Sequence, residues 1–223
     1  MAFVLDYLPQ PELKQVTGLN GRYYYNPLTE EKFDSVTTVL QRATDLSWLA
    51  HWKAKVGEEI ADEITKRALI RGTATHHIIE NYVRGRPDYD KNASPFMKKA
   101  IRGVTKILDE KVSVVYGIEM PVFSRHLNTA GTLDMFCQWN GVNAIVDYKT
   151  SKEIKRESDI SNYFFQATAY AMMIEEMYFI KVPKIIVVMI PEFDYPYFFE
   201  KDSNELRNDV EKIFIQDRQR ENQ

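Results

Sequence analysis

The sequence contains a single cysteine, Cys137, among 223 residues. One thiol cannot form an intramolecular disulfide, and it cannot supply a zinc or iron–sulfur site built from four cysteines. No apolar run reaches the length that a membrane-spanning helix needs. The opening stretch MAFVLDYLPQ has neither a basic segment nor an Arg-rich amphipathic pattern, so we expect no signal or transit peptide and no membrane partner. These absences favour a reducing, cytoplasmic setting.

An excess of basic charge is also missing, because the formal net charge is −3. The surface as a whole therefore does not attract nucleic acid, and any contact with it must come from a local group of cations. The hydrophobic fraction of 44% and the charged fraction of 27% are typical of a globular protein with a full core. No repeat, low-complexity segment or linker divides the chain, so we predict that residues 1–223 form one domain.

The first half of the chain is predicted to be mainly helical. Residues 21–40 indicate a short strand, a turn at Asn26-Pro27 and a helix capped by Ser35. Three longer helices follow, over about 45–69, 70–84 and 94–110. The first of these is predicted from apolar residues four positions apart, namely Trp48, Trp52, Val56, Ile60 and Ile64.

The second half changes to the two-residue period of β-strands. We expect three successive strands over about 113–124, 131–139 and 142–150. A helix over about 160–178, two strands over about 184–193 and 195–201, and a helix over about 203–217 complete the pattern. The order predicts an α/β fold with a central mixed β-sheet flanked by helices, in which an N-terminal helical region of about 20–110 precedes a core of about 111–217.

The stretch GTLDMFCQWNGVNAIVDYKTS places two aspartates in successive apolar strands. Asn140-Gly141 is a strong signal for a two-residue hairpin, because a type I′ turn needs positive φ at both central positions. Such a turn sets Trp139 opposite Val142. The same register sets Asp134 opposite Asp147 on one face of the hairpin, with Cβ atoms about 5 Å apart.

Lys149 lies two residues after Asp147 and therefore shares its face of the strand. The other face would carry an apolar layer, formed by Leu133, Met135, Cys137, Ala144, Val146 and Tyr148. Two facing carboxylates repel each other, and burial increases the cost, which a shared proton or a hard divalent cation such as Mg²⁺ or Mn²⁺ would relieve. A surface hairpin with solvated aspartates and a Lys149–Asp134 ion pair fits the same register equally well.

Two helices carry further candidates. His76 and Glu80 share one helix face because they are four residues apart, whereas His77 is rotated by about 100°, so both histidines cannot bind one ion. A hydrogen-bonded histidine without a metal is the alternative. Gln166 and Tyr170 are also four apart on one helix, where an amide and a phenol at a helix–sheet boundary need no catalytic role.

Basic residues follow the second strand of the hairpin. Lys152, Lys155 and Arg156 could bind phosphates there. Glu153 and Glu157 interleave with them, so a solvated loop explains the segment equally well.

Taken in order, GTATH, Glu119 in VYGIEMPVF, GTLD, IVDYKTS and QATAY resemble the motifs of the PD-(D/E)XK nuclease superfamily in its RecB-like exonuclease branch. SVTTVL and VGEE, which precede GTATH, are also similar to the group of mitochondrial genome maintenance exonucleases and their phage-encoded relatives. The resemblance covers about residues 20–175 and rests on the ordered set, since each motif alone is weak. The iron–sulfur cluster of some RecB-like branches is missing, because Cys137 is alone.

The resemblance implies a restriction-endonuclease-like core and a Mg²⁺- or Mn²⁺-dependent exonuclease that hydrolyses phosphodiester bonds in DNA. It also implies a preference for single-stranded ends, a role in replication, recombination or repair, and a phage or bacterial cytoplasm. By position, the implied metal ligands are His76, Asp134, Asp147 and the carbonyl of Tyr148. Lys149 matches the catalytic lysine, and Asp134 and Asp147 match the catalytic carboxylates. Gln166 and Tyr170 match residues that line the cleft. Glu119 and Glu80 are supporting residues, and Glu119 could instead bind a second metal.

Two other functions are consistent with these residues. A nucleic-acid-binding scaffold of the same fold would have no catalytic role, but it would also have no need of facing carboxylates. A metal-dependent phosphohydrolase acting on nucleotides is disfavoured by the absence of a P-loop and of a second His/Asp cluster in the sequence.

Overall fold

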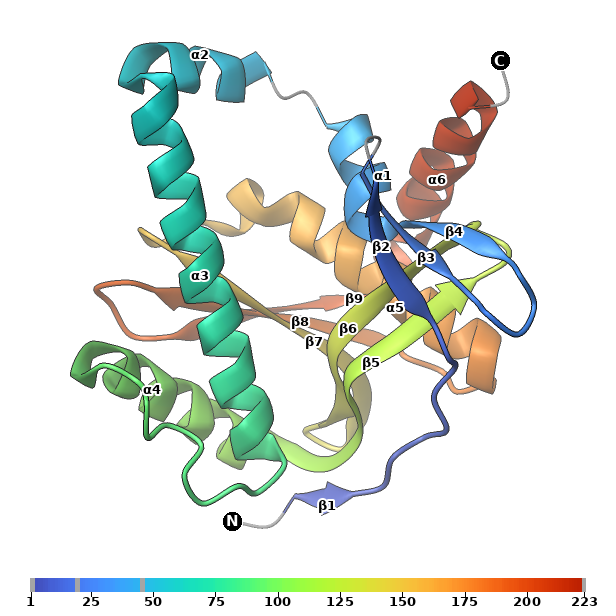
Figure 1. The fold of residues 1–223 in the computed structure, drawn as a ribbon. Helices are drawn as coiled ribbons and strands as arrows, with labels where there is room; N and C mark the ends of the chain where they lie inside the picture. The colour runs from blue at the N-terminus through green and yellow to red at the C-terminus, as the bar shows by residue number, and fades with distance from the viewer. Residues whose placement is uncertain (1–2, 19–20, 45–46, 222–223) are drawn as a thin grey trace.

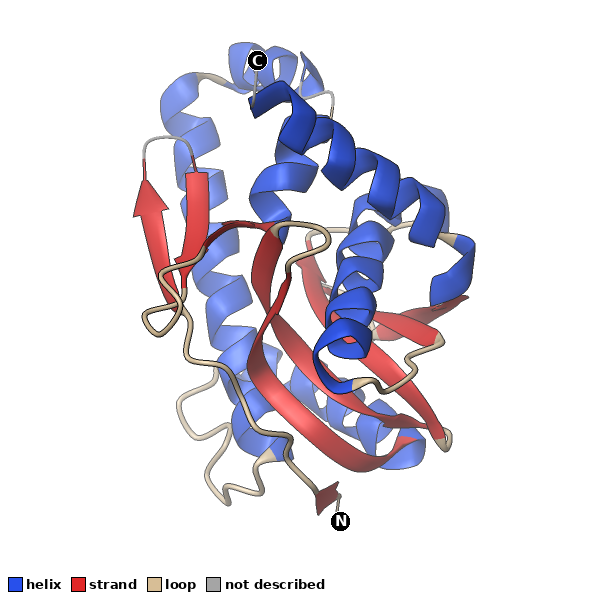
Figure 2. Ribbon diagram, turned by 90° about the vertical axis from the view of Figure 1, so that its right-hand side faces the viewer, coloured by secondary structure: helices blue, strands red, loops and turns tan. Residues whose placement is uncertain are grey.

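A mixed β-sheet forms the middle layer of the molecule, and helices cover both of its faces (Figures 1 and 2). The computed structural model describes residues 3–18, 21–44 and 47–221, and the side chain of Trp48 lies outside the described part. The predicted α/β class, with a central mixed sheet flanked by helices, is confirmed. Within the described ranges, no helix combines the length and the apolar composition that crossing a bilayer requires.

The described residues form nine strands and six α-helices in chain order. The strands are β1 (Val4–Leu5), β2 (Lys14–Gly18), β3 (Gly21–Tyr25), β4 (Lys32–Ser35), β5 (Val112–Ser124), β6 (Thr129–Trp139), β7 (Val142–Ser151), β8 (Lys184–Pro191) and β9 (Tyr197–Asp202). The helices are α1 (Val36–Ala43), α2 (Ser47–Val56), α3 (Glu58–Val83), α4 (Pro95–Lys111), α5 (Ser161–Tyr178) and α6 (Arg207–Glu221). Short 3₁₀ turns lie at Glu157–Ile160 and Ser203–Glu205.

Strand β6 is the centre of the sheet, because it pairs with three others. Antiparallel β5 follows one edge of β6 along most of its length. The other edge is divided between parallel β4, at residues 129–130, and antiparallel β7, at residues 135–139. Residues 131–134 on that edge therefore lie where β4 and β7 diverge, and they contain the GTLD motif.

Each face of the sheet has its own apolar core. Helices α3 and α4 cover one face, where Ile79, Ile101 and Leu108 pack with Met135 and Val146. Helices α1, α5 and α6 cover the other. Their contributions to the second core include Val36, Val39, Phe164, Met173, Val210 and Phe214.

The predicted register of the β6–β7 hairpin is confirmed, since Trp139 pairs with Val142 and Met135 with Val146. The ladder ends at this last pair, and the two aspartates are the next residues beyond it, one on each strand. Asp134 and Asp147 therefore do not form the cross-strand pair that the register predicts.

The predicted alternation along β6 is wrong at Leu133. Met135, Cys137, Ala144, Val146 and Tyr148 do share the core under α3 and α4, but Leu133 lies in the core on the other face. The break coincides with Glu119 on β5, which has φ of +46°, a left-handed conformation that is uncommon for a residue other than glycine. Glu119 lies between Ile118 and Met120, which pair with Met135 and Leu133 and which also belong to different cores.

The predicted boundaries of the two helices after α1 are also wrong. The chain breaks at Gly57, whose φ of +89° strongly favours glycine, and then forms α3 without interruption through residue 83. Ile60 and Ile64 are 55% and 45% exposed, because the first half of α3 extends beyond the sheet (Figure 1). Their four-residue spacing is a helical pattern without a core beneath it.

The segment before α1 contains three strands that the sequence did not suggest, namely β1, β2 and β4. The predicted strand at β3 and the turn after it are followed by β4, which pairs with β3 and β6 before the helix begins. Ser35 caps α1 as predicted, and its Oγ accepts a hydrogen bond from the backbone N–H of Thr38 at 3.1 Å. The N-terminal part of the chain is thus joined to the sheet rather than purely helical.

Candidate active site

The candidate site lies where β7 loses β6 as a partner. A continued ladder would set Tyr148 opposite Leu133, but there the backbone groups of Tyr148 bond to side chains. Its N–H donates to Oδ2 of Asp134 at 2.7 Å, and its carbonyl oxygen lies 2.9 Å from Nε2 of His76. Buried backbone groups need such partners. Where the strands diverge, Asp134 and His76 take the place of the missing strand as partners of Tyr148, and they therefore lie close together.

Three potential metal ligands surround this point. Nδ1 of His76 lies 3.4 Å from Oδ1 of Asp134 and 3.8 Å from Oε1 of Glu119. One ligand atom from each of the three residues lies within 4.8 Å of the others. With Nε2 held by the Tyr148 carbonyl, Nδ1 faces the two carboxylates, and fixing one ring nitrogen in this way is how proteins orient a metal-binding histidine.

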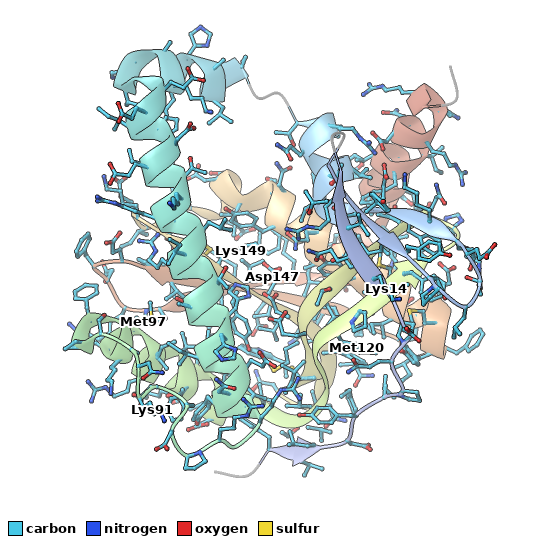
Figure 3. The ribbon with its side chains drawn as sticks, in the orientation of Figure 1. Lys14, Lys91, Met97, Met120, Asp147 and Lys149 are labelled. Carbon is cyan, nitrogen blue, oxygen red and sulfur yellow. The ribbon has the colours of Figure 1, made fainter. Side chains whose placement is uncertain are left out.

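Asp147 and Lys149 lie side by side at the same end of β7 (Figure 3). The Lys149 ammonium is 2.6 Å from Oδ2 of Asp147, and it also lies 5.2 Å from the centre of the Tyr163 ring on α5. Asp147 is 1% exposed, and its Oδ2 is paired with the Lys149 ammonium, whereas its Oδ1 has no hydrogen-bond partner among the described residues. A buried carboxylate with open lone pairs is costly, so this position has capacity for a further cation.

The charges of His76, Asp134 and Glu119 stabilise one another. Burial alone would lower the pKa of His76, but the carboxylates of Asp134 and Glu119 outweigh burial and raise this pKa to about 10. Burial would likewise raise the pKa of Asp134, but the interaction with His76 outweighs it and the pKa is lowered. In the protein alone, protonated His76 thus supplies the positive charge that these carboxylates require.

The charge of Asp147 is less well compensated. Burial and the charge of Asp134 raise its pKa, Lys149 opposes them, and the net pKa is about 6. Burial would lower the pKa of Lys149, but the carboxylates of Asp147 and Asp134 outweigh burial and raise it. Lys149 therefore stays charged at neutral pH, while Asp147 is ionised at a cost in stability.

These shifts predict how stability depends on pH. In EDTA, the free energy of unfolding should fall between about pH 5 and pH 10, by on the order of a few kcal/mol. Above pH 6 the ionised Asp147 costs stability, because its folded-state pKa of about 6 exceeds the ordinary 3.8. His76, with a pKa raised from 6.5 to about 10, stabilises the fold below pH 6.5 and loses this effect as the pH rises through 10. Urea titrations across this range would measure both.

The variant Asp147→Asn separates the two contributions. It should raise the urea midpoint at pH 7 and remove the part of the fall between about pH 4 and pH 6, while the part due to His76 remains. Wild-type stability that is constant from pH 5 to pH 10 would contradict the prediction.

A cleft of about 720 Å³ opens above these residues. It is lined by α3 between residues 68 and 80, by residues 148–150 of β7, by Glu119 and by Arg22 of β3. His76, Glu119 and Lys149 reach the cleft, whereas buried Asp147 lies beneath its lining. A ligand in the cleft would therefore meet the histidine, one carboxylate and the lysine together.

The two residues of QATAY that the resemblance assigns to the cleft do not line it. Tyr170 is buried, and Nε2 of Gln166 lies 3.4 Å from its hydroxyl oxygen. The Tyr170 ring instead occupies the space above Gly131, where a Cβ atom would come within 2.5 Å of it. The glycine of GTLD and the tyrosine of QATAY are thus packed against each other, three residues before Asp134.

Gly131→Ala should therefore destabilise the protein by about 1–3 kcal/mol through overpacking. Removing the ring in Gly131→Ala/Tyr170→Ala should make the alanine much less costly than it is beside Tyr170, which a double-mutant cycle by urea unfolding would measure. Gly72→Ala is the control, because its Cβ would make only an ordinary contact, at 3.6 Å, and alanine favours the helix. Additive effects of the two substitutions would contradict the packing argument.

The remaining predicted residues lie outside the group of potential metal ligands, although His77 and Glu80 line the same cleft. His77 has a side chain 65% exposed and lies 3.5 Å from Glu80, which also bonds to Arg84 and lines the cleft. The helix thus turns His76 toward the carboxylates and His77 away from them. The three basic residues after β7 are exposed and outside the cleft lining: Lys152, Lys155 and Arg156.

Sequence reasoning did not find Arg22, and it placed Glu119 as a supporting residue or a ligand of a second metal rather than beside His76 and Asp134. Arg22 belongs to GRYYY, which shows no motif and brings it to the cleft only through the pairing of β3 with β4. The two-residue period of the strand does indicate one thing, namely that the side chains of Arg22 and Tyr24 lie on the same face of β3.

The donor set fits a hard divalent cation. Carboxylate oxygens and an imidazole are ligands that Mn²⁺ accepts, and carboxylates suit Mg²⁺. Oδ1 of buried Asp147, which has no hydrogen-bond partner among the described residues, is the atom that most needs such a charge.

Comparison with known proteins points to exonucleases. No protein-family model matches the chain. Mitochondrial genome maintenance exonuclease 1 from Homo sapiens is 28% identical over 137 residues, and the same protein from Mus musculus is 26% identical over 136 residues. Each match covers 58% of this chain but only 40% of the relative. The crystal structure of a candidate exonuclease from Eubacterium rectale superposes with a TM-score of 0.46 and 15% identity, over 66% of this chain and 64% of that one. The chain is thus similar in sequence to exonucleases, over two fifths of their length.

Proposed function

We propose that the protein is a Mg²⁺- or Mn²⁺-dependent DNA exonuclease that prefers single-stranded ends and acts in replication, recombination or repair. One observation carries the proposal: His76, Glu119 and Asp134 form a potential ligand group, and His76, Glu119 and Lys149, the last paired with buried Asp147, line one cleft. Oδ1 of Asp147 is buried without a hydrogen-bond partner among the described residues, a cost that a bound cation would relieve. The similarity to exonucleases supports the same reaction.

His76, Asp134 and Asp147 would hold the metal, with Glu119 as a further carboxylate and the Tyr148 carbonyl as a backbone ligand or as the group that orients His76. Bound there, Mg²⁺ or Mn²⁺ would polarise a phosphate oxygen and lower the pKa of a water molecule. Glu119 differs from the other carboxylates because it reaches the cleft itself. It is therefore suited to a second cation or to a ligand that changes on substrate binding.

Lys149 would act on the substrate rather than on the metal. Its ammonium lines the cleft and is charged, so it can donate hydrogen bonds to a phosphate oxygen or hold the attacking water. Asp147 fixes its position at 2.6 Å. The exposed basic residues Lys152, Lys155 and Arg156 would extend the phosphate contacts beyond the cleft.

Cleavage of end-labelled DNA tests the proposal. Wild-type protein with Mn²⁺ should degrade linear single-stranded DNA faster than duplex and leave circular single strands intact, and EDTA should stop the reaction. Asp147→Asn, purified in the same way, controls for a contaminating nuclease and should be inactive. Cleavage of the circle would indicate an endonuclease, and metal-independent binding without cleavage would favour the scaffold function.

A further inference from the structure

We propose that Arg22 forms a phosphate-binding subsite in the wall of the cleft that faces α3, where it holds a backbone phosphate of the nucleic-acid strand. The inference rests on the proposed function and adds a residue that no motif marks. Arg22 lines the same cleft as His76, Glu119 and Lys149, although it comes from a different part of the sheet. Four features of the structure support the subsite.

The face of β3 on which Arg22 lies is turned toward β6, the strand of Asp134. Side chains two residues apart in a strand point the same way, so Arg22 shares its face with Tyr24. The Tyr24 hydroxyl lies 3.2 Å from Oγ1 of Thr132, on β6, two residues before Asp134. The face of β3 that carries Arg22 is therefore held against the strand that supplies the carboxylate.

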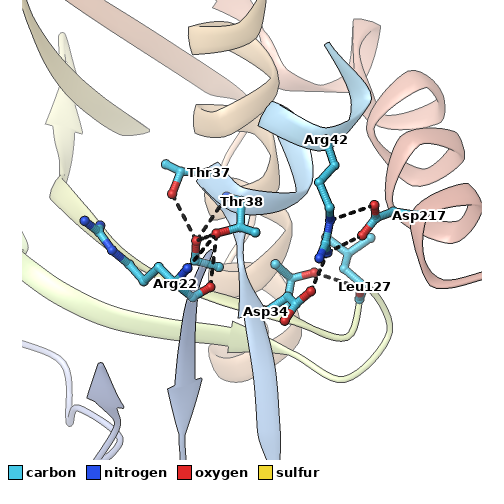
Figure 4. Close-up of polar contacts among 9 residues, drawn as sticks. Arg22, Asp34, Thr37, Thr38, Arg42, Leu127 and Asp217 are labelled. Atoms are coloured by element: carbon cyan, nitrogen blue, oxygen red, sulfur yellow. Dashed lines mark hydrogen bonds and ion pairs between the residues drawn. The ribbon is translucent and has the colours of Figure 1, made fainter. Parts of the chain in front are cut away.

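The backbone of Arg22 is fixed to helix α1 (Figure 4). Oγ1 of Thr38 lies 3.1 Å from both the N–H and the carbonyl oxygen of Arg22, and it also bonds to the capping hydroxyl of Ser35 at 2.8 Å. The approach is so close that a Cβ on Gly21 would come within 2.7 Å of the Thr38 methyl group. A cation on such an anchored strand loses less entropy when it binds than one on a free loop.

The guanidinium of Arg22 is free to bind a ligand. Among the described residues, its side chain makes no hydrogen bond, ion pair or ring contact; only its backbone is engaged. Neighbouring arginines differ, because Arg42 pairs with Asp34 and Asp217 and Arg71 pairs with Glu192. An exposed, anchored and unpaired arginine in a cleft has no structural role there that we can identify.

The charge of the cleft indicates what Arg22 binds. The carboxylates of Glu119 and Glu80 line it, and Lys149 is already paired with Asp147. A polyanionic strand entering this cleft needs another cation, and a guanidinium suits phosphate through two parallel hydrogen bonds. Across the cleft, α3 presents Leu69, which is 69% exposed and offers an apolar surface to sugars or bases.

Equilibrium binding of a labelled single-stranded oligonucleotide in EDTA tests the subsite, since no cleavage occurs there. Arg22→Ala should weaken binding by about tenfold and reduce the slope of log affinity against log salt by about 0.7, the loss of one phosphate contact. Arg22→Lys should recover part of the affinity. Arg220→Ala, which removes the same charge from α6, should change neither quantity.

Cleavage and folding measurements make the result specific. Arg22→Ala should raise the KM for DNA, leave Mn²⁺ affinity unchanged and melt at the wild-type temperature, because the guanidinium makes no hydrogen bond or ion pair with the described residues. An active wild type with an Arg22→Ala variant of equal affinity and equal salt slope would overturn the subsite and leave the proposed function standing. A wild type that neither binds nor cleaves DNA would overturn both.

Discussion

Lys149→Ala should lower the rate of DNA cleavage by about 100- to 1000-fold while leaving Mn²⁺ affinity nearly unchanged or slightly higher. A charged ammonium has no lone pair for a metal, and the carboxylates of Asp147 and Asp134 raise the pKa of Lys149 and keep it charged. Removing it takes a cation from beside Asp147, which makes the site more negative. Single-turnover cleavage and calorimetric Mn²⁺ titration measure the two effects separately.

Two further variants show whether the position of the charge matters. Lys149→Arg should restore little activity, since a planar guanidinium cannot occupy the place of a compact ammonium 2.6 Å from Asp147. Lys212→Ala is the control, because this lysine on α6 has a side chain 70% exposed and lies outside the cleft lining. If Lys149→Ala cleaves at a rate close to wild type, the nuclease proposal loses its central residue and the scaffold function is favoured.

The hairpin that carries Lys149 shows how far sequence reasoning reaches. Asn140-Gly141 has positive φ at both positions, as a two-residue turn of this type requires, and the predicted register follows through Met135 and Val146. Turn chemistry and strand period are local properties, so the sequence predicts them well. The same holds for the cap at Ser35 and for the phase of the helix that separates His76 from His77.

What sequence reasoning missed depends on contacts between distant segments. The ladder ends before Asp134 because β6 changes partner from β7 to β4, and the sequence did not suggest β4. The left-handed conformation of Glu119 has no signature in VYGIEMPVF, yet it coincides with the break in alternation that brings Asp134 to the side of His76. The predicted register places the two aspartates correctly along their strands. They do not form a ladder pair, although the charge of Asp134 still raises the pKa of Asp147.

The adjacent histidines allow the sharpest test of this geometry. His76→Ala should reduce cleavage by about 100-fold or more, because loss of a group that merely orients a ligand already costs about 10- to 100-fold. His77→Ala should have little effect, since its side chain is 65% exposed and lies 3.5 Å from Glu80 rather than near Asp134. The two variants remove the same side chain from consecutive residues of one helix, so each controls for the other in helix propensity and in purification.

Of the two histidine variants, the one that loses cleavage activity should also lose Mn²⁺ affinity. His76→Ala should weaken metal binding, because it removes the imidazole between Asp134 and Glu119, whereas Lys149→Ala should not. The distinction separates a ligand from a group that acts on the substrate, within one cleft. Equal losses in His76→Ala and His77→Ala would mean that the imidazole near the carboxylates has no special role. A greater loss in His77→Ala would place the reaction nearer to His77, which lines the same cleft.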